Sequence, residues 1–145
     1  MRYMFKFGKK RLAKSWQGDL ITSKKNTMDE KLLEELQNIH VAAWNEKNTE
    51  KREQLLRKIY AEDVKMYDKE FILHSLKEVS DFVGKLLAED PLFDFSVAKP
   101  IEALQNSARF FGHIRTSGGM LNSMDFFLFE NGKVQHLYAF MEPAV

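Results

Sequence analysis

The part of the sequence that most constrains the fold is residues 43–68. This stretch reads as the end of one helix, a break at Asn48 and Thr49, and a second helix that continues to about Tyr60. A short β-prone segment then follows and ends at Asp68. Two helices that lead directly into a strand predict a domain that combines helices with a sheet.

Capping boxes, with a hydroxyl residue three positions before a Glu, mark the starts of two further helices. Thr27 and Glu30 predict that the first helix starts at Thr27, and Ser75 and Glu78 open a third helix. The third helix should end at Asp90, because the following Pro disfavours the α conformation there. Apolar residues recur at helical spacing in both helices, and His40 lies on the apolar stripe of the first.

The rest of the chain has the pattern of a sheet. Strands are predicted at residues 64–68, 71–74, 93–99, 107–116, 120–130 and 133–141. Gly118-Gly119 and Asn131-Gly132 are hairpin turns that join the last three strands. The predicted fold class is α+β, with helices packed on one face of a curved, mainly antiparallel sheet.

The composition limits the chain to one domain and excludes several kinds of chemistry. A length of 145 residues with 44% hydrophobic residues can bury one core. No apolar run reaches about 18 residues, so no transmembrane segment is expected. The absence of Cys excludes disulfides, thiolate catalysis and Cys-based zinc sites. This fits a reducing compartment, and a cytoplasmic location is expected.

The charges separate a basic tail, residues 1–26, from a domain at residues 27–145. Residues 1–25 carry eight Lys and Arg against Asp19, whereas the remainder has a net charge of −6. Such a tail is typical of a disordered terminus, but it could also bind an acidic surface, lie on a membrane or direct targeting. The acidic domain argues against nucleic-acid binding.

Residues 124–129 form a strand that is apolar on both faces, except for Asp125. One face should meet the helices and a cavity, and the other a neighbouring subunit. Asp125 shares its face with Phe127 and Phe129. A carboxylate among apolar residues is costly unless it is protonated or paired, so Asp125 is a candidate functional residue.

Residues 28–142 resemble the SnoaL-like branch of the nuclear transport factor 2-like (NTF2-like) superfamily. The resemblance rests on the order of "AWN" at residues 43–45, a charged helix, "LL" at 55–56, "YAEDV" at 60–64 and a closing Asp68. It implies a cone-shaped fold with three N-terminal helices on a curved sheet around a deep apolar pocket. Members include ketosteroid isomerases and polyketide cyclases, as well as proteins without catalysis.

Matched to the ketosteroid isomerase pattern, three residues fall on catalytic positions. Asp68 matches the position of the general base. Asp125 matches the position of the protonated Asp of the oxyanion hole, and His40 matches the position of the Tyr of that hole. The resemblance thus implies proton transfer at a carbon next to a carbonyl group. Structural alternatives stay open, since His40 could be a core residue and Asp68 a turn residue.

Aromatic residues are candidates for lining an apolar ligand pocket or simply for the core: Trp44, Tyr60, Phe82, Phe111, Phe127 and Tyr138. The ligand expected is a small hydrophobic molecule, bound by an enzyme or by a non-catalytic binding module of the same fold. An interaction protein recruited through its basic tail is a third hypothesis.

No cofactor and no metal are expected. Walker loops, dinucleotide fingerprints and serine elbows do not occur, and His74, His113 and His136 lack metal-ligand spacing. Arg109 and Arg115 share one side of their strand with His113, where they could bind an anion or lie in a dimer face. A homodimer formed through the sheet is expected.

Overall fold

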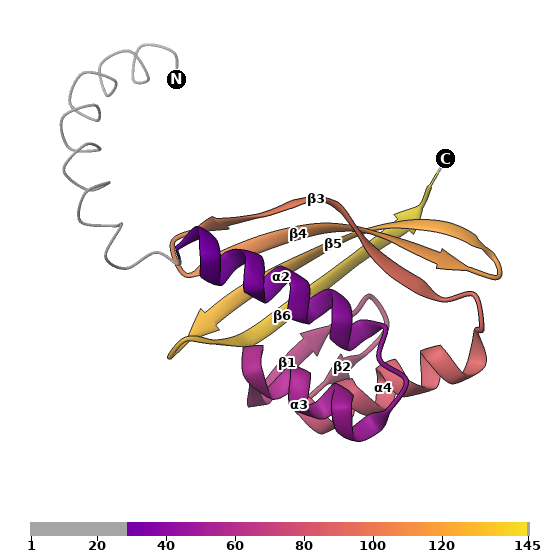
Figure 1. The fold of residues 1–145 in the computed structure, drawn as a ribbon, viewed down its shortest axis with the longest axis horizontal. Coiled ribbons are helices and arrows are strands. Elements are labelled where there is room, and N and C mark those ends of the chain that lie inside the picture. The colour runs from indigo at the N-terminus through magenta and orange to yellow at the C-terminus, as the bar shows by residue number, and fades with distance from the viewer. Residues whose placement is uncertain (1–28, 145) are drawn as a thin grey trace, which may run out of the picture.

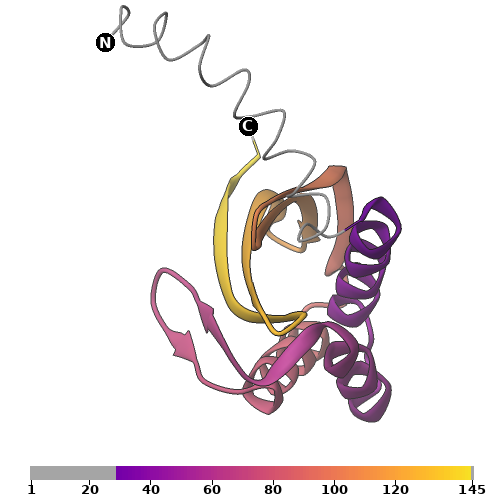
Figure 2. The ribbon, with the colours of Figure 1, turned by 90° about the vertical axis from the view of Figure 1, so that its left-hand side faces the viewer.

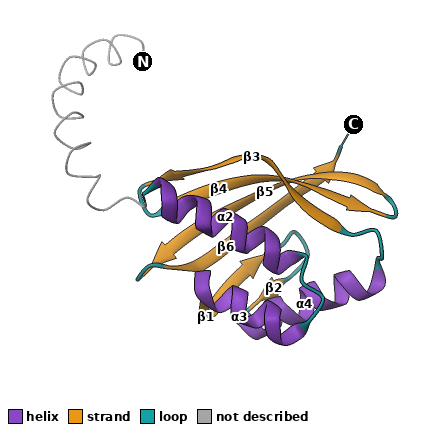
Figure 3. Ribbon diagram, viewed as in Figure 1, coloured by secondary structure: helices purple, strands orange, loops and turns teal. Residues whose placement is uncertain are grey.

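The computed structural model describes residues 29–144, which form three helices and six strands (Figures 1 and 3). The helices are α2 (Glu30–Trp44), α3 (Thr49–Ile59) and α4 (Leu76–Glu89). The strands are β1 (Tyr60–Tyr67), β2 (Ile72–Leu73), β3 (Asp94–Leu104), β4 (Ser107–Thr116), β5 (Gly119–Glu130) and β6 (Lys133–Pro143). The predicted basic tail lies outside the described residues. Within residues 29–144, no helix has the length and apolarity needed to cross a membrane.

The six strands form one sheet in the order β2-β1-β6-β5-β4-β3. All neighbours are antiparallel except β1 and β6, which run parallel. Figure 2 shows that the sheet curves strongly without closing and that the helices pack on it. The α+β prediction is therefore confirmed.

The helix starts follow local capping chemistry. Asn48 and Ser75 are the N-caps of α3 and α4, as predicted. The prediction for α2 was wrong by two residues, because Asp29 rather than Thr27 is the N-cap. The Asp29 carboxylate accepts a hydrogen bond from the backbone N–H of Leu32 at 2.8 Å. A carboxylate fills this position as well as a hydroxyl does, and its charge complements the helix dipole.

Two strands extend four or five residues beyond their predicted bounds. β1 begins directly at Tyr60, and β3 continues to Leu104 through Pro100. Proline is tolerated because β3 is an edge strand with one unpaired side. The predicted turn at Asn131 and Gly132 is present, with φ of 52° and 78°, as such a hairpin turn requires.

Side-chain amides fix α2 along β3. Asn45 donates to the carbonyl oxygen of Phe95 at 2.7 Å and accepts from its N–H at 2.8 Å. Gln37 accepts from the N–H of Ile101 at 2.9 Å. These bonds satisfy backbone groups of β3 and set how α2 lies over the sheet.

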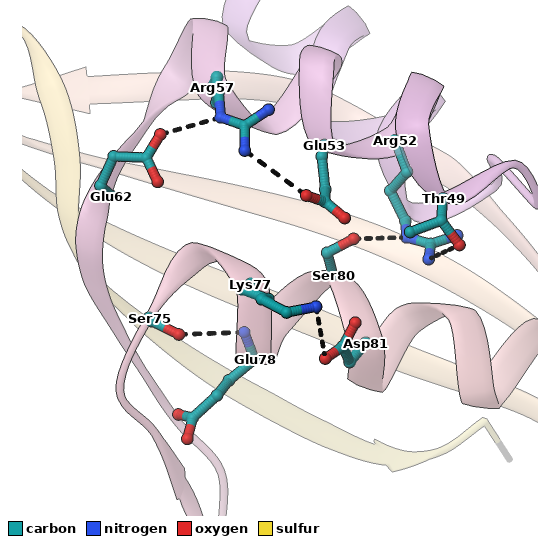
Figure 4. A network of polar contacts seen from close by, with 10 residues as sticks. All are labelled: Thr49, Arg52, Glu53, Arg57, Glu62, Ser75, Lys77, Glu78, Ser80 and Asp81. Carbon is teal, nitrogen blue, oxygen red and sulfur yellow. Dashed lines mark hydrogen bonds and ion pairs between the residues drawn. The ribbon is translucent and has the colours of Figure 1, made fainter.

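A buried arginine joins α3 to α4 (Figure 4). It also binds the loop before α3. Arg52 is 1% exposed, and its Nε donates to Ser80 Oγ at 2.9 Å. Its Nη1 donates to the carbonyl oxygen of Glu46 at 2.7 Å, and Nη2 to Thr49 Oγ1 at 3.3 Å. The guanidinium thus holds three segments together through neutral acceptors.

Candidate functional site

Asp125 lies in the middle of β5 on the face that is turned to the helices. Ser123, Asp125 and Phe127 are buried, whereas the residues between them are only partly buried. This alternation follows the two-residue period of a strand. The predicted placement of Asp125 on the inner face among apolar residues is what the structure shows.

His40 reaches Asp125 from α2. His40 is fully buried, and its Nε2 lies 2.9 Å from Asp125 Oδ2. Phe95, Phe110 and Phe127 meet the imidazole at near-perpendicular angles of 79° to 88°, with ring centroids 5.0 to 5.6 Å away. The aromatic rings leave the imidazole little room to turn, so His40 is fixed as the partner of the carboxylate.

Tyr60 and Trp44 extend this pair into a buried chain of four side chains. The Tyr60 hydroxyl lies 2.8 Å from His40 Nδ1, and Trp44 Nε1 donates to the same hydroxyl at 3.1 Å. Burial raises the pKa of Tyr60 well above 10.0; the indole hydrogen bond opposes this and the charge of Asp125 adds to it. Tyr60 therefore keeps its proton at ordinary pH.

The donors of this chain point in one direction. Indole N–H can only donate, so the Tyr60 oxygen accepts from Trp44. The Tyr60 proton then goes to His40 Nδ1, the remaining partner of that hydroxyl among the described residues. A neutral imidazole that accepts at Nδ1 carries its proton on Nε2 and donates it to Asp125. In this arrangement Asp125 Oδ2 accepts a hydrogen bond from His40 and does not donate one to it.

Asp125 also faces a cavity of about 310 Å³ on the inner side of the sheet. About a tenth of its side chain is exposed, and Oδ1 accepts no hydrogen bond within residues 29–144. Apolar side chains make up most of the wall: Trp44, Met66, Phe82, Leu86, Phe93, Phe95, Ile114, Leu121, Ala139 and Met141. Glu89, Asp90, Thr116 and Ser123 are its other polar residues. The cavity can hold a small, mostly apolar molecule beside the carboxyl group of Asp125.

The structure does not bring Asp68 into this cavity. Asp68 follows the end of β1, where its N–H donates to the carbonyl oxygen of Phe71 and its Oδ1 accepts from the N–H of Glu70. It lines a second groove of about 620 Å³, which shares Ser123, Ala139 and Met141 with the cavity but does not include Asp125. This is the geometry of the turn residue that the sequence left open as the alternative.

The six aromatic candidates fall into three groups. Trp44 and Phe82 line the cavity beside Asp125. Tyr60 and Phe127 are buried behind it, against His40. Phe111 and Tyr138 line the groove that also holds Asp68. Only the first pair is placed to contact a ligand of Asp125.

Sequence reasoning missed Ser123. It lies two residues before Asp125 on the same face, lines the same cavity and is 5% exposed. Its Oγ is buried without a hydrogen-bond partner in the described part of the chain. The two-residue period that placed Asp125 would have placed Ser123 beside it.

Comparisons at the level of sequence find no relative, since neither a family model nor a curated protein matches the chain. Structural comparison does find proteins of similar fold. A candidate isomerase of the SnoaL-like family from Agrobacterium tumefaciens superposes with a TM-score of 0.66 at 19% identity, over 74% of this chain and 94% of that one. A candidate SnoaL-like polyketide cyclase from Jannaschia sp. CCS1 gives 0.61 at 10% identity, over 80% and 91%.

A third neighbour was solved with a small molecule bound. It is a protein of ketosteroid isomerase-like fold from Catenulispora acidiphila in complex with trimethylamine. Its TM-score is 0.61 at 11% identity, over 79% of this chain and 86% of that one. At such identities the likeness concerns the fold. This chain therefore has the fold of the SnoaL-like and NTF2-like proteins.

Proposed function

We propose that this protein binds a small apolar carbonyl compound beside Asp125 and moves a proton at the carbon next to the carbonyl. One observation supports this most directly: a carboxylate with one oxygen fixed by His40 and the other free opens on an apolar cavity of about 310 Å³. A base in such surroundings is poorly solvated and can act on a weakly acidic C–H bond.

In the proposed reaction, Asp125 Oδ1 takes a proton from the carbon next to the carbonyl. The C–H bond breaks, its electron pair forms a C=C bond, and the carbonyl oxygen becomes an enolate oxygen. The proton then returns from Asp125 to the same carbon or to a conjugated one, so no co-reactant is consumed. His40 does not line the cavity and acts as a positioning residue.

These roles differ from those that the resemblance implied. There, Asp68 was the base, and His40 and a protonated Asp125 stabilised the enolate. Asp68 lines a different groove, whereas Asp125 lines the apolar cavity and accepts the His40 hydrogen bond at Oδ2, which leaves Oδ1 without a hydrogen bond in residues 29–144. The proposal therefore assigns the base to Asp125.

Hydrogen–deuterium exchange tests the proposal without knowledge of the natural substrate. The full chain would be incubated in D2O with 2-acetylnaphthalene and a panel of small cyclic ketones, and loss of the α-proton NMR signal followed. The exchange rate with wild-type protein should exceed the rate in buffer alone. The rate due to the protein should be about a hundredfold lower for D125N than for wild type. The exposed Asp63 gives the control variant D63N, which should exchange like wild type. Exchange at the buffer rate for every ketone would overturn the proposal.

The alternative is a binding module without turnover. The cavity combines the carboxyl groups of Glu89, Asp90 and Asp125 with aromatic side chains, and carboxylates among aromatic rings also suit a small ammonium ion. The neighbour that holds trimethylamine supports this alternative. Saturable binding of trimethylammonium that D125N abolishes, with no ketone exchange, would favour the alternative.

We also propose that the protein forms a homodimer through the outer face of the sheet. Tyr67 and Tyr138 stack there with ring centroids 4.4 Å apart and planes 9° from parallel. Phe140 borders the same groove and is 57% exposed. An apolar aromatic surface of this kind is typical of subunit interfaces.

A further inference from the structure

The hydroxyl of Ser123 is buried near Asp125 but is not part of the hydrogen-bonded chain of Trp44, Tyr60, His40 and Asp125. Ser123 is 5% exposed, and its Oγ has no hydrogen-bond partner among the described residues. Buried hydroxyls are almost always paired, because an unpaired one loses its hydrogen bonds to water without replacement. Alanine at this position would avoid that loss, so stability alone does not account for the serine.

The surroundings of Ser123 accommodate the hydroxyl but offer it no partner. It stands opposite Gly112 on β4, and a Cβ atom at Gly112 would lie 2.8 Å from Ser123 Oγ. The same Cβ would lie 2.9 Å from the ring of Phe95, so a side chain at this position would displace both groups. A glycine therefore leaves the space that the hydroxyl occupies.

Ser123 and Asp125 lie on one wall of the same cavity. Two residues along a strand are about 6.7 Å apart. A carbonyl group and its neighbouring carbon fit between two such side chains, with a hydrogen bond at the oxygen and the acidic C–H bond toward the carboxylate.

We propose that Ser123 is the hydrogen-bond donor that binds the carbonyl oxygen of the ligand and orients its α-carbon toward Asp125. This inference rests on the proposed function and specifies the ligand class: a neutral, mostly apolar molecule with one hydrogen-bond acceptor. Ser123 Oγ is itself buried, so this role requires the side chain to turn toward the cavity by rotation about χ1. As the enolate forms, Ser123 donates to an oxygen that gains negative charge, which strengthens the bond.

Two ligands of equal shape test the donor. One is 2-acetylnaphthalene, and the other is 2-isopropenylnaphthalene, in which a CH2 group replaces the carbonyl oxygen. Wild-type protein should bind the ketone about three- to tenfold more tightly than the hydrocarbon, as one neutral hydrogen bond allows. S123A should lose this preference and bind the hydrocarbon unchanged.

The matched control is S96A. Ser96 is a partly buried strand serine that does not line the cavity, and its variant should keep the preference. Thermal unfolding of S123A should occur at the wild-type temperature or above, because no hydrogen bond is lost. An unfolding temperature that is not lowered would show that any loss of binding by S123A does not come from misfolding.

Exchange of the ketone's methyl protons separates this inference from the proposed function. If wild type catalyses exchange but S123A keeps the ketone preference and the exchange rate, the role of Ser123 is overturned and the enzyme remains. If wild type shows no ketone preference at all, the inference is overturned whatever S123A does. If the preference depends on Ser123 but no exchange occurs, the hydroxyl is confirmed as a ligand donor and the enzyme proposal fails.

Discussion

His40 Nε2 lies 2.9 Å from Asp125 Oδ2, although 85 positions of sequence separate the two residues. His40 is fully buried, and the side chain of Asp125 is 10% exposed. This contact joins α2 to the middle of the sheet and connects the buried Tyr60–Trp44 pair to the cavity.

We expect H40L to destabilise the protein by about 3 kcal/mol, because Asp125 and the Tyr60 hydroxyl both lose a partner while they remain buried. Urea unfolding measures the loss. The matched control is H136L, since His136 is partly buried and bonds a single hydroxyl, that of Tyr67. It should cost about 1 kcal/mol. Equal losses in the two variants would show that the His40–Asp125 contact contributes little.

The sequence predicts much of this arrangement, because its strongest signals are local. Asn48 and Ser75 cap their helices, and the alternation around Asp125 places it on the inner face. His40 lies on the apolar stripe of α2, and a helix packed on that face brings it to the sheet. The pairing of His40 with Asp125 can therefore be predicted from the helical period around His40, the strand period around Asp125 and the correct fold.

Asp68 and Tyr60 were harder to place, because their positions depend on long-range pairing. β1 pairs in parallel with β6, with a register shift between Tyr60 and Lys65, and sequence periodicity does not predict such a shift. Asp68 belongs to the turn that follows β1, and its side chain therefore does not lie on the inner face of the sheet. The burial of Tyr60 against His40 comes from the same pairing.

The direction of the buried chain predicts one tautomer for His40. Nitrogen-15 NMR should show a proton on Nε2 and none on Nδ1, because the Tyr60 hydroxyl donates to Nδ1. In Y60F, where that donor is absent, His40 should populate both tautomers. A wild-type spectrum with the proton on Nδ1 would reverse the chain and make Asp125 the donor.

Tyr60 should also make stability fall at high pH. Burial raises its pKa well above 10.0, so the unfolded chain releases this proton before the folded protein does. The stabilisation is complete below about pH 10 and is lost as pH rises toward the folded pKa. Urea unfolding between about pH 8 and 11 should show a steeper decline for wild type than for Y60F. Tyr67, whose pKa burial also raises, is present in both proteins and cancels. Parallel declines would contradict the prediction.

Gly84 on α4 should be intolerant of alanine, although alanine normally stabilises a helix. A Cβ there would lie 2.6 Å from Nη2 of Arg52. The guanidinium cannot move away without loss of its bond to Ser80, which Figure 4 shows, and of its bond to the carbonyl oxygen of Glu46. G84A should therefore cost about 1 to 3 kcal/mol. In an R52M background the same substitution should be neutral or stabilising, and a loss of the same size there would exclude Arg52 as the cause.

The proposed dimer predicts that one charge on the outer face separates the subunits. Phe140 is 57% exposed on β6 beside the groove that Tyr67 and Tyr138 line. F140E would place a carboxylate in the proposed interface, where it loses water without gaining a partner. Sedimentation velocity should give a dimer for wild type and a monomer for F140E. L104E is the matched control, because Leu104 is 73% exposed but lies at the end of edge strand β3, outside that groove. A monomeric wild type, or a dimer that F140E leaves intact, would exclude this face as the interface.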